Sequence, residues 1–137
     1  IDSIIDRTIK PFLLTFGLAT CGTLPFAIDI RLITPLLGGL VTYTPSSVPA
    51  LQHWGLMVFG VGVLMVVAAF RPWLRFETML FSAIEKAFLV YLFLSNQGQS
   101  WVAGYLFAAA LDAAIVLYSI LYFLSERGRP ARWIREG

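Results

Sequence analysis

Three ionisable residues, Glu85, Lys86 and Asp112, lie near the centres of two long apolar stretches of the sequence. In the hydrocarbon core of a membrane, each ionised group costs on the order of 2.5–3.5 kcal/mol on insertion-based scales. A chain that carries such groups there must pair them, and a carboxyl in this setting is suited to carrying a proton. The sequence therefore predicts a polar network inside an apolar protein.

The connection between the two stretches sets the depth of the acids. Residues 95–100 read SNQGQS, a short polar turn that forces the flanking helices into an antiparallel hairpin. At a rise of about 1.5 Å per residue, Glu85 lies about 15 Å before this turn and Asp112 about 16 Å after it. Both carboxylates are therefore expected near the middle of a membrane on neighbouring helices, with Lys86 at the same level.

Lys86 is expected to bridge to Asp112, with Glu85 either in the same network or protonated. The hydroxyl of Ser82, one helical turn earlier, is predicted to reach Glu85 or Lys86. Because one lysine cannot neutralise two carboxylates, one acid should hold its proton or find a partner outside this chain. Two interpretations stay open: a network that only fixes helix packing, within the chain or across an interface, and one that carries protons or substrate. The inward stripe of this helix is predicted at Thr78, Ser82, Glu85 and Leu89.

The composition places these residues in a membrane protein. Of the 137 residues, 58% are hydrophobic and 13% are charged, whereas soluble domains carry roughly 25% charged residues. A membrane-spanning helix needs about 20 apolar residues, and four segments of suitable length occur, at 11–30, 49–70, 73–94 and 101–124. The predicted fold is all-α, a single domain formed by an antiparallel bundle of four transmembrane helices.

The connection at residues 31–48 is the longest between these segments. It contains Pro35, Gly38, Gly39 and Pro45, so a regular helix throughout is not expected. Its apolar residues predict that it lies at the membrane interface or caps the bundle. A lid over a site is the alternative interpretation.

Basic residues gather on one side of the four-pass arrangement. Arg7 and Lys10 lie before or at the first segment and Arg71 and Arg75 near the second connection, whereas Arg31 lies on the opposite side. By the positive-inside rule, both termini are predicted to be cytoplasmic. The basic C-terminal tail is suited to contact with anionic lipid headgroups, or to anchoring the topology alone, through Arg127, Arg129, Arg132 and Arg135.

His53 and Trp54, about one turn into the second segment, are candidate contacts for a haem or a chlorophyll-type pigment. A lone histidine at a membrane interface is also an ordinary hydrogen-bonding anchor. The single histidine excludes a bis-histidine haem site within one copy, and the single cysteine, Cys21, excludes an internal disulfide and a thiolate metal cluster. No cofactor is required by the sequence.

Catalytic patterns are missing from the sequence. It has no nucleophile elbow, no zinc-ligand spacing and no phosphate-binding loop. Neither an enzyme activity nor a metal site is predicted. The expected partners are the lipid bilayer and other membrane protein subunits, and no nucleic acid.

The architecture resembles that of the DoxX-like proteins, small four-helix membrane proteins of bacteria. The resemblance rests on four helices with both ends inside, on His53-Trp54-Gly55 at the opening of the second helix, and on the buried charges of the third helix. That family includes subunits associated with membrane oxidoreductases. The resemblance therefore implies an accessory role beside a redox partner.

The first expectation for function is a non-enzymatic accessory or structural subunit of a larger redox or energy-transducing complex in the bacterial inner membrane. The alternative is a small proton-coupled transporter that uses Glu85 and Asp112. A weaker alternative is a haem-binding or pigment-binding membrane protein that uses His53.

Overall fold

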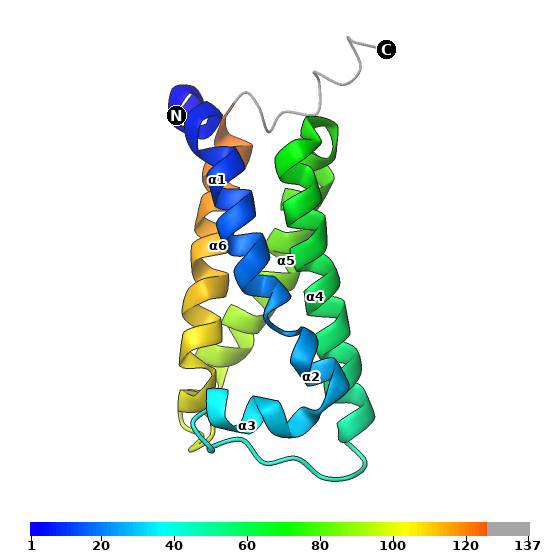
Figure 1. Cartoon of the computed structure of the whole chain (residues 1–137). Coiled ribbons are helices and arrows are strands. Elements are labelled where there is room, and N and C mark those ends of the chain that lie inside the picture. The colour runs from blue at the N-terminus through cyan, green and yellow to red at the C-terminus, as the bar shows by residue number, and fades with distance from the viewer. Residues whose placement is uncertain (126–137) are drawn as a thin grey trace.

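The computed structural model describes residues 1–125, and it consists of antiparallel helices (Figure 1). The long helices are α1 (Asp2–Cys21), which continues into the short α2 (Leu24–Ile28), α4 (Val48–Phe70), α5 (Arg75–Ser95) and α6 (Leu106–Leu124). Four helical segments are long and apolar enough to cross a membrane. The predicted all-α bundle is confirmed, and the chain is an integral membrane protein.

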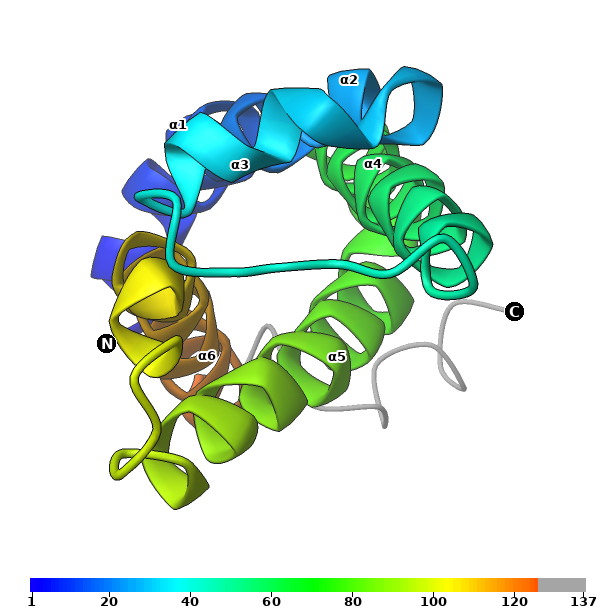
Figure 2. The same ribbon diagram turned by 90° about the horizontal axis from the view of Figure 1, so that it is seen from below.

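The two ends of the bundle differ in charge and in covering. The start of α1 lies at the same end as the turn between α4 and α5 (Figure 1), and we call this the basic end because Arg7, Lys10, Arg71 and Arg75 lie near it. At the opposite end, α3 (Ile33–Leu36) lies across the bundle, and the chain that follows it crosses to the start of α4 (Figure 2). We call this the capped end.

The first helix begins at Asp2, whereas the sequence predicted a start at Pro11. The first ten residues contain four charges, so their average hydropathy is low. Ile5 and Ile9, one helical turn apart, are nevertheless fully buried and extend the apolar face of Phe12 and Leu13. The helix therefore begins with an amphipathic stretch at residues 2–10, and Pro11 lies in its interior.

Pro25 breaks the first membrane segment. Proline lacks the N–H that would bond to the carbonyl of the preceding turn, so α1 ends at Cys21 and α2 starts with Pro25 in its first turn. The Thr23 hydroxyl satisfies two carbonyls at this break, that of Thr20 at 3.1 Å and that of Gly55 in α4 at 3.0 Å. One side chain thereby ties the break to the neighbouring helix.

The connection at residues 31–48 contains more helix than the sequence suggested. A 3-10 turn at Ile30–Leu32 leads into α3, which ends at Leu36. The turn that follows contains Gly38 and Gly39, with φ angles of +64° and +69° that favour glycine. Gly104 fixes the place of this cap, since a Cβ there would lie 2.5 Å from the Leu37 carbonyl oxygen. Residues 31–48 therefore lie across one end of the bundle, as the capping interpretation predicted.

The second, third and fourth predicted segments need smaller changes of boundary. The second helix starts at Val48 rather than residue 49. Short 3-10 turns, Pro72–Leu74 and Val102–Tyr105, precede α5 and α6. Arg75 then caps the preceding helix, since its guanidinium donates to the carbonyls of Ala68 and Ala69 at 3.1 and 3.2 Å.

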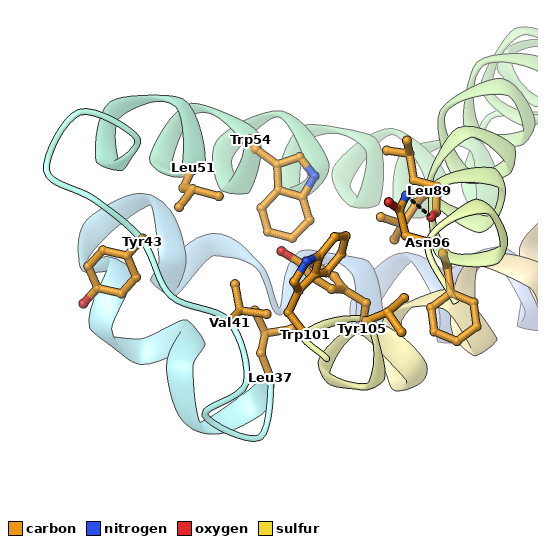
Figure 3. A pocket seen from close by; sticks show the side chains of 12 residues that line it. Leu37, Val41, Tyr43, Leu51, Trp54, Leu89, Asn96, Trp101 and Tyr105 are labelled. Carbon is orange, nitrogen blue, oxygen red and sulfur yellow. Dashed lines mark hydrogen bonds between the residues drawn. The ribbon is translucent and has the colours of Figure 1, made fainter. Parts of the chain in front are cut away.

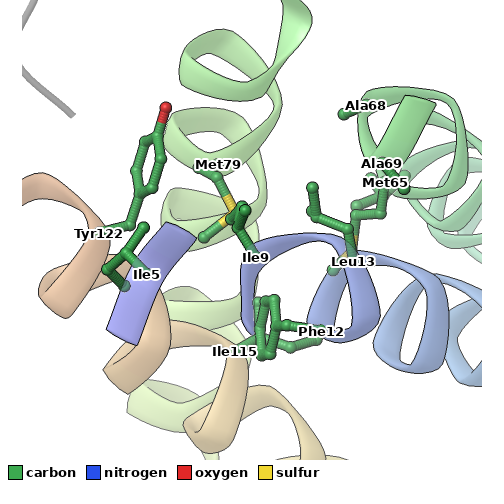
Figure 4. Packing of buried hydrophobic residues seen from close by; sticks show 11 residues of the cluster. Ile5, Ile9, Phe12, Leu13, Met65, Ala68, Ala69, Met79, Ile115 and Tyr122 are labelled. Carbon is green, nitrogen blue, oxygen red and sulfur yellow. The ribbon is translucent and has the colours of Figure 1, made fainter. Parts of the chain in front are cut away.

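The half of the bundle next to the basic end contains the main hydrophobic core (Figure 4). All four long helices contribute to it, and Leu13, Met65, Met79 and Ile115 are completely enclosed. None of these core residues lines either of the two cavities described below. This half of the bundle is therefore closely packed around the core. Its members are Ile5, Ile9, Phe12, Leu13, Val61, Met65, Ala68, Ala69, Met79, Ile115 and Tyr122.

An exposed ion pair lies at the capped end. Arg31 contacts Asp29 at 2.6 Å. Side-chain hydrogen bonds from Arg31 hold the pKa of the Asp29 carboxyl below its usual value. At the other end of the chain, the predicted lipid contacts Arg127, Arg129, Arg132 and Arg135 lie outside the described residues.

Candidate functional site: a chamber that ends on a buried ion cluster

Two adjoining cavities occupy the half of the bundle next to the capped end, and Figure 3 shows the first of them. Their volumes are about 290 and 250 Å³. Four residues line both cavities, so we treat them as one chamber. We call the part next to the cap, which is at the bottom of Figure 1, the upper part, and we call the part nearer the membrane middle the lower part. The shared residues are Leu37, Trp54, Leu89 and Tyr105.

The upper part of the chamber is lined by aromatic and aliphatic side chains. Trp54 of α4 lies across it from Trp101 and Tyr105 (Figure 3), and the rings of Trp101 and Tyr105 meet edge to face at 6.0 Å. Leu37, Val41 and Tyr43 of the cap close it from above. The segment that the sequence analysis placed as a cap therefore covers a cavity.

The lower part of the chamber ends on the ion cluster. Lys86 and Asp112 both line it, and their side chains are 3% and 6% exposed. The Lys86 Nζ lies 2.9 Å from Glu85 Oε2 and 3.5 Å from Asp112 Oδ1. The α5–α6 hairpin thus brings together the three charges, as its short turn predicts, and Lys86 lies between the two carboxylates.

The inward face of α5 runs through Lys86 rather than through Glu85, which corrects the predicted stripe. Thr78, Ser82 and Lys86 follow each other at intervals of four residues and are all buried. Glu85 lies about 100° away around the helix, so its side chain is 28% exposed. Lys86 therefore reaches Asp112 inside the bundle and Glu85 at its edge.

Two buried hydroxyls near the cluster have no hydrogen-bond partner within residues 1–125. One is Ser82 Oγ, so the predicted bond to Glu85 or Lys86 is not formed. The other is Thr20 Oγ1, on a residue that is 2% exposed and lines the lower chamber. An unbonded buried hydroxyl costs about 1–3 kcal/mol. The Thr20 hydroxyl is therefore a free polar group at the same end of the chamber as Asp112.

His53 and Trp54 are not brought to one cavity. Trp54 lines the chamber and lies parallel to Phe26 at 6.4 Å, whereas His53 is exposed and is not among the described lining residues. Adjacent residues on a helix point about 100° apart, so only one of them can face inward. The haem or pigment hypothesis stays a prediction that the chamber does not support.

No protein family, curated protein or solved structure compared with this chain matches it. The resemblance to the DoxX-like proteins thus stays a prediction. The chamber and its ion cluster are therefore the features that indicate a function.

The chamber can hold a small molecule with an apolar body and a polar group. Its lower part alone, at about 250 Å³, exceeds the cavities of ~150 Å³ that admit benzene. Within residues 1–125, no group of three or more His, Cys, Asp or Glu side chains is placed to hold a metal ion. The sequence analysis missed Thr20 and the cap residue Leu37 as parts of this site. Their roles depend on the helix break and on the path of the cap, which no local pattern encodes.

Proposed function

We propose that this chain is a small proton-coupled carrier rather than an enzyme. The observation that supports it is the course of the chamber, which runs from the capped end to Asp112 and Lys86, while the basic half contains the buried hydrophobic core. Carriers commonly place the substrate and the coupling ion near the membrane middle, with access from one side at a time. The carboxyl of Asp112 is the group that exchanges the proton, and Lys86 positions it.

The charged cluster beside the chamber also supports a transport function. An ionic network that only fixes helix packing needs no cavity beside it. A pocket that only binds apolar molecules needs no ionised residues in its lining. Charged residues within membrane segments often mark proton and substrate pathways. The juxtaposition of Asp112, the free Thr20 hydroxyl and an apolar chamber favours a pathway.

The arrangement of basic residues supports an orientation with the basic end in the cytoplasm, by the positive-inside rule. We propose that both termini are inside a bacterial inner membrane and that the capped end faces outward. The accessory-subunit hypothesis, with other membrane subunits as partners, stays a prediction, because no feature of the described residues favours it over a carrier.

The proposal is tested by measuring from which side of the membrane an aqueous reagent reaches the chamber. In a Cys21→Ser background, a cysteine in place of Ala108, which lines the chamber, should react with a membrane-impermeant thiol reagent from the capped side. A carrier should also allow slower labelling from the basic side, since the site alternates between the two faces. The matched control, Ala68→Cys in the sealed core, should stay unlabelled from both sides.

The labelling is measured in vesicles of defined orientation by the mass of the labelled protein. No labelling of the chamber cysteine from either side would show that the chamber has no aqueous access. Labelling from one side under all conditions would indicate a fixed pocket, and either result contradicts the carrier proposal.

A further inference from the structure

The lower chamber presents an unbalanced carboxylate. Lys86 is closer to Glu85, at 2.9 Å, than to Asp112, at 3.5 Å, and Glu85 is not among the described lining residues. One ammonium group neutralises one carboxylate, so the cluster of Glu85, Lys86 and Asp112 keeps one negative charge in excess when both acids are ionised. Asp112 is the acid of this cluster that lines the chamber, so the excess charge faces the ligand there.

The charges of Glu85, Lys86 and Asp112 favour a positively charged ligand over a negatively charged one. A cation beside Asp112 gives two positive and two negative charges, which balance. An anion beside Lys86 would give three negative charges around one positive charge, in an apolar setting where unbalanced charge is expensive. Among the described lining residues, the other ionisable groups are the phenols of Tyr43 and Tyr105, which are uncharged at neutral pH. The helices α1 and α4 contribute Thr20 and Trp54, which do not ionise.

The walls of the chamber also favour a cation. Trp54, Trp101 and Tyr105 surround the route to Asp112, and the faces of aromatic rings attract ammonium groups. The lone pairs of Thr20 Oγ1, which is buried and unpartnered within residues 1–125, are available to a positive group at the same end. An apolar body would fill the remainder of the chamber.

We propose that the substrate class is the small lipophilic cation, an ammonium group on an aromatic or branched apolar body, bound with its positive nitrogen at Asp112. This inference rests on the proposed carrier function and names its substrate. The exchange is one for one: the O–H bond of the protonated Asp112 carboxyl breaks, its proton leaves to water, and the carboxylate formed pairs with the cation. No oxidant or further reactant is needed.

Three probes of nearly the same shape test the proposal. They are benzyltrimethylammonium, its uncharged carbon isostere neopentylbenzene, and the anion benzylsulfonate. Binding of labelled benzyltrimethylammonium is measured to the full chain in phosphatidylcholine nanodiscs, with empty nanodiscs correcting for partition into lipid. The other two probes are added as competitors. We expect saturable binding of the cation and weak competition by the anion.

Variants localise the binding. Asp112→Asn should weaken binding of benzyltrimethylammonium at least about tenfold, whereas Asp112→Glu should retain most of it. The matched control is Asp29→Asn, which removes an exposed acid at the capped end and should leave binding unchanged. Thermal unfolding of each variant in the same nanodiscs checks that binding is lost without loss of the fold.

The outcomes separate this proposal from the carrier proposal. Competition by benzylsulfonate equal to that of the cation, or undiminished binding to Asp112→Asn, would overturn the cationic substrate class. Such results leave the labelling of the Ala108→Cys variant unaffected. If that variant is labelled from both faces while the cation fails to bind, the carrier proposal stands and only its substrate class is wrong.

Discussion

Replacing Lys86 with methionine is expected to destabilise the bundle by about 3–5 kcal/mol, because it leaves buried charge without a partner. Methionine keeps the length and apolar stem of lysine but removes the ammonium group that lies between Glu85 and Asp112. The Asp112 residue is 4% exposed, so its carboxylate is largely removed from solvent. The free energy of unfolding is measured by denaturant titration in mixed micelles.

A second change separates the charge from the packing. In the Lys86→Met background, Asp112→Asn should restore most of the lost stability, since it removes the unpaired charge and keeps the shape of the side chain. The control is Arg31→Met, which breaks an ion pair whose arginine side chain is 80% exposed and should change stability little. A Lys86→Met protein as stable as the wild type would show that the cluster is not a buried ionic network.

Gly62→Val is expected to have the second large effect on stability, because α1 and α4 lie in close contact at this residue. A Cβ at Gly62 would lie 2.7 Å from the Cys21 nitrogen and 2.7 Å from the Gly17 oxygen, both backbone atoms that cannot move aside without moving the helix. Small residues at such contacts allow close helix packing in membranes. Gly62→Ala should cost about 1–3 kcal/mol and Gly62→Val more.

The same helix supplies a matched control. Gly60 has no neighbouring atom within 4 Å of its would-be Cβ, so Gly60→Ala should leave stability unchanged or raise it slightly. Both variants are compared by thermal unfolding in the same detergent. Equal losses at the two positions would mean that the close contact of α1 with α4 does not contribute to stability.

The sequence predicted the parts of this fold that depend on average hydropathy and short connections. The turn at residues 95–100 was enough to place Glu85 and Asp112 at one depth on adjacent helices, and the structure joins them through Lys86. The helix break at Pro25 follows from its missing N–H. These features are local, so a single sequence can reveal them.

Other features depend on contacts between distant residues. Residues 2–10 did not resemble a membrane helix, because only Ile5 and Ile9 reach the core and the surrounding charges mask them. The choice of Lys86 over Glu85 as the inward residue depends on the rotation of α5 against α6. The chamber needs the cap, the helix break and three further helices at once, so no pattern along the chain could predict its position.

Proton movement driven by a substrate in vesicles tests the central claim most directly. Full-length protein is reconstituted with a trapped pH-sensitive dye, and a panel of small amphipathic cations, anions and neutral aromatics is added outside. We predict that at least one compound moves protons through the wild type, Asp29→Asn and Asp112→Glu proteins. Asp112→Asn should reduce this flux to the level of empty vesicles. Equal flux in Asp112→Asn and the wild type, or no flux in the wild type with any compound, would contradict a proton-coupled carrier that works through Asp112.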